Sequence, residues 1–207
     1  MHTVAILSQK GGTGKTTLAL HLAVAAGQKG QSVAVLDLDP QASSAGWKDS
    51  RPGDDPYVIA LPHTRLSQAL ELAKEGGATL ALIDTAPHSE GAALAAAKAA
   101  DVILIPCRAG ILDLRAIGTT AELAKLAGKP AYVVLNAMPP RASQVLADAR
   151  EAVATHGLAV APVAIQQRAA YGHALTVGKT AQEYEPDGKA AEETAQLYQW
   201  LHSVLVA

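Results

Sequence analysis

A segment rich in glycine and lysine follows the first apolar run of the chain and leads into a stretch of helical period. Its residues are, in order, Ser8, Gln9, Lys10, Gly11, Gly12, Thr13, Gly14, Lys15, Thr16 and Thr17. Glycines let backbone N–H groups converge on a phosphate, a lysine reaches the β- and γ-phosphates, a hydroxyl binds Mg²⁺, and a helix N-terminus carries a positive dipole end. The segment holds all these parts in strand–loop–helix order. We therefore predict a nucleoside triphosphate site near the start of the chain.

Short apolar runs alternate with Ala- and Leu-rich segments of helical period along the rest of the chain. This pattern predicts βαβ units and a parallel sheet. The predicted strands are Thr3–Ser8, Ser32–Asp37, Leu80–Asp84, Val102–Pro106, Ala131–Asn136 and Leu158–Ile165, with a short extra strand at Tyr57–Leu61. The predicted helices are Lys15–Lys29, Arg65–Glu75, Glu90–Ala100, Asp113–Ala127, Ala142–His156 and Ala190–Leu205. The expected fold is α/β, a mostly parallel central sheet flanked by helices on both faces, in one domain that spans residues 1–207.

Composition narrows the class of protein. The 207 residues carry a formal net charge of −2, which excludes a histone-like chain held to nucleic acid by bulk charge. Cys107 is the only cysteine, so an intrachain disulfide, a CxxC redox pair and an all-cysteine metal site within one chain are excluded. The N-terminus has no signal-peptide pattern, and no apolar run approaches the ~20 residues of a membrane span. We expect a cytoplasmic protein.

Three aspartates stand at the ends of predicted strands. Asp37 and Asp39 close one strand, and side chains two residues apart point to the same face of a strand. Asp84 ends the apolar run at residues 80–83. Open α/β sheets bind ligands beyond the carboxyl ends of their strands. Such residues alone are more often loop caps, but together with the phosphate loop they favour a catalytic site.

These motifs together resemble the ParA/MinD group of P-loop ATPases. The strings KGGTGKTT, DLDPQ (residues 37–41) and DTAP (residues 84–87) are similar in order and spacing to the Walker A, Walker A′ and Walker B motifs of the ParA branch. Gln9 stands where an ordinary P-loop has glycine, and Lys10 marks the deviant Walker A form. Residues 164–171 look like the segment after the last strand of small, ParF-type plasmid-partition proteins. The resemblance covers nearly the whole chain.

The resemblance implies ATP and Mg²⁺ as cofactors and assigns a role to each motif residue. Lys15 would contact the β- and γ-phosphates, and Lys10 would reach the partner's phosphates in a nucleotide-sandwich homodimer that forms only with ATP. Asp39 would position the attacking water. The metal residues would be Thr16 as a direct ligand, Asp84 through a water, and Asp37 as an organiser of the Mg²⁺ region. The nucleotide-binding residues would be Gly11, Gly12, Thr13, Gly14, Lys15, Thr16, Thr17, Asn136 and Arg168.

The adenine contacts are the less specific part of this set. Asn136 ends a predicted strand and resembles the base-reading Asn of related P-loop proteins. An Asn that only caps the loop before residues 138–140 explains the sequence equally well. Arg168 and the residues around Pro162 are further candidates near the base.

Nucleic-acid binding has two open interpretations. Residues 138–181 carry Arg141, Arg150, Arg168 and Lys179 against Asp148 and Glu151. On charge alone these are ordinary solvated helix faces. The resemblance implies nonspecific DNA binding through Arg141, Arg150 and Lys179, gathered by dimerisation into a patch whose affinity would depend strongly on salt. No room precedes Thr3 for a helix-turn-helix domain, so operator recognition is not expected.

The expected function is that of a cytoplasmic, nucleoid-associated ATPase that segregates a plasmid, a chromosome region or a protein cargo. A ParB-like or other cargo-bound protein would stimulate its slow hydrolysis. A MinD-like membrane-associated ATPase is one alternative, but residues 194–207 contain no Lys or Arg to form a basic membrane-binding helix. A metabolic enzyme of the dethiobiotin-synthetase kind is another, and the DLDPQ motif argues against it.

Overall fold

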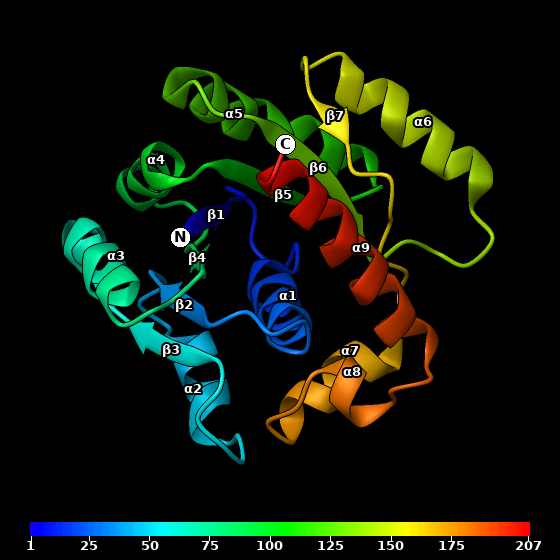
Figure 1. The fold of residues 1–207 in the computed structure, drawn as a ribbon. Coiled ribbons are helices and arrows are strands. Elements are labelled where there is room, and N and C mark those ends of the chain that lie inside the picture. The colour runs from blue at the N-terminus through cyan, green and yellow to red at the C-terminus, as the bar shows by residue number, and fades with distance from the viewer.

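Seven strands form one parallel sheet in the order β3-β2-β4-β1-β5-β6-β7 (Figure 1). The computed structural model describes residues 1–207. The strands are β1 (His2–Ile6), β2 (Val33–Asp37), β3 (Tyr57–Ala60), β4 (Leu80–Asp84), β5 (Val102–Arg108), β6 (Ala131–Asn136) and β7 (Ala159–Val160). Every neighbouring pair is parallel. All carboxyl ends therefore meet at one edge of the sheet.

Helices connect the strands and cover both faces of the sheet (Figure 1). They are α1 (Lys15–Gly27), α2 (Ser43–Asp49), α3 (Leu66–Glu75), α4 (Glu90–Ala99), α5 (Ile111–Ala127), α6 (Ser143–Ala154), α7 (Ala169–Thr176), α8 (Ala181–Tyr184) and α9 (Lys189–Leu205), with a 3₁₀ turn, η1 (His63–Arg65), before α3. None of these helices has the length and apolar character that crossing a membrane requires.

Alternation along the strands divides the core into two layers. Val4 and Ile6 of β1 pack in the layer that contains α1 and α9, whereas Ala5 and Leu7 pack in the layer with α4, α5 and α6. This is the side-chain period of two that a strand imposes. The predicted fold class, a parallel sheet flanked by helices on both faces, is confirmed.

Helix α1 is buried on nearly all sides, because ten of its 13 residues lie in the interior. It is covered by the sheet on one side and by α7, α8 and α9 on the other. A helix that is apolar all round belongs in the core of a protein. The phosphate loop thus leads directly into the centre of the molecule.

Helix α4 faces the core with small side chains. Ala92, Ala93, Ala96 and Ala97 are its buried residues. Alanine covers about a fifth of the chain and combines high helix propensity with little volume.

The structure corrects four details of the predicted elements. The last strand spans only Ala159–Val160 instead of residues 158–165, because Pro162 has no N–H to donate to the ladder. Beyond it, the chain follows β6 through single contacts, such as the N–H of Ile165 donating to the carbonyl of Leu135. Helices α2, α7 and α8 were not predicted at all. They are short, with seven, eight and four residues.

Candidate functional site

The phosphate loop adopts a conformation that requires glycine at two positions. Gly12 has φ +71° and Gly14 has φ +95°, in the left-handed region that other residues rarely adopt. A Cβ on Gly14 would also lie 2.2 Å from Nδ2 of Asn136. Gly14 directly precedes α1, so the loop brings backbone N–H groups to the positive end of that helix. This geometry suits a phosphate group.

The two lysines of the loop have different surroundings. Lys15 is buried, and its Nζ donates to the carbonyl of Lys10 at 3.2 Å. Burial lowers the pKa of Lys15, although Asp84 and Asp39 oppose this effect. Lys10 points away from this cradle and forms an ion pair with Asp113 at the start of α5, with Nζ 2.8 Å from Oδ1. Of the two lysine side chains, only that of Lys15 therefore contacts the phosphate loop of its own chain.

Asp84 lies at the centre of a buried polar cluster. Its Oδ2 accepts hydrogen bonds from the Thr16 hydroxyl at 2.7 Å and from the Ser44 hydroxyl at 2.9 Å. Its Oδ1 is equally buried and has no hydrogen-bond partner. Burial is the main reason that the pKa of Asp84 rises to about 6. An unpartnered buried carboxylate oxygen is costly, and a bound cation would satisfy it.

The residues around Asp84 fit Mg²⁺. Mg²⁺ prefers oxygen ligands and is usually held by one or two carboxylates, a hydroxyl and the phosphates of the nucleotide. The Thr16 hydroxyl and the free Oδ1 of Asp84 are such oxygens and lie beside the phosphate loop. The family resemblance implied this role for both Asp84 and Thr16. The structure brings them within hydrogen-bond distance.

Asp37 and Asp39 lie beside Asp84 and do different things. Asp37 pairs with Asp84 in the β2–β4 register and is fully buried. Its two oxygens accept the N–H groups of Asp39 at 3.0 Å and Ser44 at 2.9 Å, so it shapes the loop between β2 and α2. Asp39 is only half-buried, and its Oδ1 accepts the N–H of Gln41. Asp39 is also near enough to Lys15 to oppose the lowering of that lysine's pKa.

Asn136 is held against the phosphate loop. Its Nδ2 donates to the carbonyl of Thr13 at 2.7 Å, and its Oδ1 accepts the N–H of Ala137. Asn136 therefore caps its own loop and also contacts the loop that binds phosphate. Thr17, Asn136 and Tyr171 line one small space behind the phosphate loop.

Arg168 is engaged by α9. Its Nε and Nη2 donate to Oε1 of Glu193 at 2.9 and 2.6 Å, and Nη2 also donates to the Gln166 side chain. Glu193 further accepts the N–H of Gln166 and the hydroxyl of Tyr171. The arrangement fixes residues 166–171 next to Asn136. It leaves Arg168 in a structural ion pair in this state of the protein.

The candidate DNA-binding residues do not gather within one chain. Arg141 and Arg150 are exposed on and before α6, which packs against β7 and α5. Lys179 is half-buried in the turn between α7 and α8, which pack against α1 and α9. Figure 1 shows α6 and the α7–α8 pair at separate ends of the molecule. A shared patch would have to be assembled from two chains.

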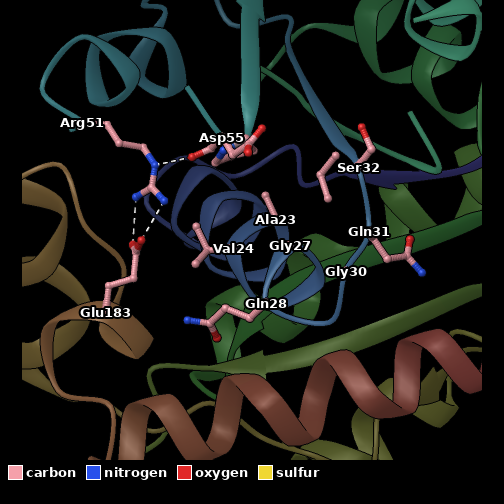
Figure 2. Close-up of a pocket in the computed structure, with 12 residues that line it drawn as sticks. Ala23, Val24, Gly27, Gln28, Gly30, Gln31, Ser32, Arg51, Asp55 and Glu183 are labelled. Atoms are coloured by element: carbon pink, nitrogen blue, oxygen red, sulfur yellow. Dashed lines mark hydrogen bonds and ion pairs between the residues drawn. The ribbon is translucent and has the colours of Figure 1, made fainter. Parts of the chain in front are cut away.

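A cavity of about 480 Å³ lies at the far end of α1 from the phosphate loop (Figure 2). Arg51 and Glu183 line it and bind one another. Their charges are thus already neutralised by this pair. The cavity is remote from the buried carboxylates, and we do not assign it to the nucleotide.

Sequence reasoning missed Ser44, Asp113 and Glu193, which hold Asp84, Lys10 and Arg168. Each is distant in sequence from the residue it contacts, so spacing gave no signal. Ser44 alone had a local hint, because it follows the DLDPQ string closely and small hydroxyl residues are common at helix starts. Asp113 and Glu193 could be identified only once the fold was known.

A family model covers most of the chain. Residues 4–181 match the model described as the CobQ/CobB/MinD/ParA nucleotide binding domain. A curated protein named "Maintenance of carboxysome distribution protein A", from Gloeobacter kilaueensis, is 33% identical over 201 residues, covering 92% of each chain. The match is therefore of nearly full length on both sides.

Solved structures show the same fold. The apo structure of McdA from Cyanothece has a TM-score of 0.79 and 20% identity, and the match covers 97% of this chain and 99% of that one. The septum site-determining protein MinD from Pyrococcus horikoshii, solved as a complex with Mg-ADP, has a TM-score of 0.77 and 20% identity, with coverage of 97% and 95%. At such identities the likeness concerns the fold alone.

Proposed function

Because the chain belongs to the CobQ/CobB/MinD/ParA nucleotide-binding family, we propose that it is an ATP-hydrolysing positioning protein that distributes a protein cargo. The resemblance to ParA/MinD ATPases in the sequence motifs is thereby confirmed. A protein cargo is favoured over a plasmid by the carboxysome-distribution relative, which matches over 92% of both chains. The cargo itself would be recognised through a partner protein.

The buried cluster around Asp84 is the observation that carries this proposal. Thr16, Lys15 and Asp84 converge at the carboxyl edge of the sheet, where α/β proteins bind ligands. Lys15 lies in the loop and neutralises charge on the β- and γ-phosphates, while backbone N–H groups of the loop orient them. Mg²⁺, when bound with ATP by Thr16 and Asp84, supplies further positive charge at these phosphates.

We assign to Asp39 the role of orienting the attacking water. It is half-buried, and its Oδ1 accepts the N–H of Gln41, which restrains the carboxylate. In phosphoryl transfer the protein chiefly positions the water and stabilises charge. An Asp39→Ala variant should therefore bind ATP and hydrolyse it at least about 100-fold more slowly. Normal hydrolysis would show that another residue orients the water.

Lys10 provides the link between ATP and assembly. The side chain of Lys10 binds Asp113 on α5 and not the residues of its own phosphate loop. In a sandwich of two chains, the γ-phosphate of the partner would compete with Asp113 for this lysine. A phosphate carries more negative charge than a carboxylate, so ATP favours the exchange. ADP, which lacks the γ-phosphate, favours it less.

Nonspecific DNA binding would follow from dimerisation. Arg141 and Arg150 lie on the α6 segment and Lys179 lies at another end of the molecule, and a dimer doubles each of them. Few phosphate contacts give weak, salt-dependent binding, which suits a protein that must release DNA after hydrolysis. The partner that carries the cargo would trigger this release.

Sedimentation and DNA retention with ATP and with ADP test the proposal. We expect dimers and retained DNA only with ATP, and loss of both in Lys10→Ala and Lys15→Gln. Lys98→Ala, an exposed lysine on α4, is the matched control and should behave like the wild type. Dimers that form equally with ADP, or binding to lipid vesicles in place of DNA, would contradict the proposal.

A further inference from the structure

The start of helix α2 is bonded to both buried carboxylates of the candidate metal site. Ser44 lies in its first turn and is fully buried. Its hydroxyl donates to Oδ2 of Asp84 and its backbone N–H to Oδ2 of Asp37, each at 2.9 Å. The start of α2 is therefore coupled to both carboxylates.

The other end of α2 is fastened to the turn between α7 and α8. The indole Nε1 of Trp47 donates to the carbonyl of Lys179 at 3.2 Å. Arg51, just after the helix, donates to the carbonyl of Gly178 at 3.2 Å and forms two bonds with Glu183, at 2.8 and 2.7 Å (Figure 2). These bonds join segments about 130 positions apart in sequence.

The segment between the two ends of α2 is closely packed. Trp47 is buried against Leu20 and Val24 of α1, and the Arg51 guanidinium lies 4.8 Å from the centre of the Trp47 ring. Gly178 has φ +68°, and a Cβ there would lie 2.1 Å from the carbonyl oxygen of Ser50. Seven helical residues span about 10 Å. A shift at Arg51 would thus move Ser44 as well.

We propose that Ser44 is a positioning residue for Mg²⁺ binding and that the Arg51–Glu183 ion pair holds it in place from the far end of α2. The inference rests on the proposed function, since it takes Asp84 and Thr16 as the residues that hold Mg²⁺. Thr16 and Ser44 share Oδ2 of Asp84. Once the Thr16 hydroxyl turns to an ion, Ser44 is the side chain left to orient that carboxylate. Hydrogen-bond partners of metal-binding side chains typically change metal affinity by about 10- to 100-fold.

A titration of Mg²⁺ against the binding of a fluorescent ATP analogue tests Ser44. We expect Ser44→Ala to raise the Mg²⁺ concentration for half-maximal binding by about 10-fold, with nucleotide affinity in EDTA unchanged. Ser43→Ala is the matched control, because Ser43 is the exposed neighbour in the same helix and should not shift the curve. An unchanged Mg²⁺ midpoint in folded Ser44→Ala would overturn the inference and leave the proposed function intact.

A second variant tests the ion pair at the far end of α2. It also keeps the inference testable if Ser44→Ala does not fold. Arg51→Gln removes the ion pair without touching the nucleotide site and should raise the Mg²⁺ midpoint about two- to fivefold. Arg65→Gln, an exposed arginine, is the control. In the double variant with Ser44→Ala the two shifts should not add, because both act through one helix. A normal midpoint in Arg51→Gln would refute the remote hold, and a wild type that never binds ATP would refute both proposals.

Discussion

Two buried polar clusters share helix α1 and differ in how their groups are satisfied. The metal-side cluster, at the start of the helix, consists of Thr16, Ser44, Asp37 and Asp84. The His21 cluster, further along α1, consists of His21, Tyr171, Gln182, Glu193 and Thr194. In the metal-side cluster the unpartnered atom is a carboxylate oxygen, Oδ1 of Asp84, whereas in the His21 cluster it is an uncharged amide oxygen of Gln182.

Both ring nitrogens of His21 have a hydrogen-bond partner. Its Nε2 accepts the N–H of Ala181 at 3.0 Å, so Nδ1 carries the proton and donates to the carbonyl of Thr17 at 2.7 Å. Burial lowers the pKa of His21 to about 4, which keeps it neutral, and Tyr171 packs edge-on against it. Neutral, bonded groups stabilise a fold, while a buried charge without a partner indicates a ligand. The comparison separates the two roles on one helix.

The largest expected effect comes from breaking the metal-side cluster. Asp84→Asn should lower ATP hydrolysis at least about 100-fold, because it removes a carboxylate that we propose holds Mg²⁺. The same variant should be more stable than the wild type without nucleotide, by about 1 to 3 kcal/mol, because it removes a buried charge. Steady-state hydrolysis and urea unfolding measure the two effects. Asp148→Asn, on the exposed face of α6, should change neither.

Disrupting the His21 cluster should lower the stability of the fold strongly and change ATP binding little. His21→Ala should lower the free energy of unfolding by about 2 to 4 kcal/mol, because it opens a cavity and leaves the N–H of Ala181 unpaired. At temperatures where the variant is folded, ATP affinity should stay within about threefold of the wild type. His173→Ala, an exposed histidine on α7, is the control. A large loss of ATP affinity without loss of stability would refute the division between the clusters.

The two clusters should change the free energy of unfolding in opposite directions as the pH falls. The pKa of Asp84 is raised from 3.8 to about 6, so the native state binds the extra proton and gains stability as the pH falls through this range. The pKa of His21 is lowered from 6.5 to about 4, so stability is lost as the pH falls from 6.5 to 4. Each contribution amounts to roughly 3 kcal/mol over its range.

These opposing slopes become visible in the difference between two proteins. Between pH 6 and 4, Asp84→Asn should lose up to about 1.4 kcal/mol per pH unit more than the wild type does. Taking the difference cancels the titrations that the two proteins share. Urea unfolding at pH 4.5, 5 and 5.5 without nucleotide measures it. Parallel curves would show that Asp84 does not titrate in this range.

The smallest effect concerns one hydroxyl of the His21 cluster. The Tyr171 hydroxyl donates to the carbonyl of Ala190 at 3.0 Å, and Glu193 lies within 3.2 Å of it. Tyr171→Phe should cost about 1 kcal/mol of stability and leave hydrolysis unchanged. Tyr57→Phe, on the exposed edge strand, should cost nothing measurable. A fall in hydrolysis would connect this cluster to catalysis.

The sequence was informative where function depends on local order. The phosphate loop, the strand-end aspartates and the alternation of strands and helices are written in consecutive residues, so the sheet edge and the placement of Lys15, Thr16 and Asp84 could be predicted. Helix α2 could not, because Ser43, Ser44 and Gly46 are poor helix formers. Its stability comes from Asp37, which accepts the N–H of Ser44, and from the burial of Trp47.

Contacts between segments that are distant in sequence could not be predicted either. The sequence places Arg51 in a loop and Glu183 in an acidic stretch, and nothing in either segment identifies the other. The same holds for Arg168, which sequence reasoning placed near the base and the structure pairs with Glu193. Ion pairs of this kind exist only once the topology has brought the elements together.

Helix α1 has a further consequence, because the helix that receives phosphate is also the centre of a core layer. Its amide hydrogens should exchange with solvent only when the whole molecule unfolds. Bound ATP then protects them by the full linkage free energy, which is about 2.7 kcal/mol at a hundredfold excess over the dissociation constant. Hydrogen exchange in α1 would thus measure nucleotide occupancy without any label on the nucleotide.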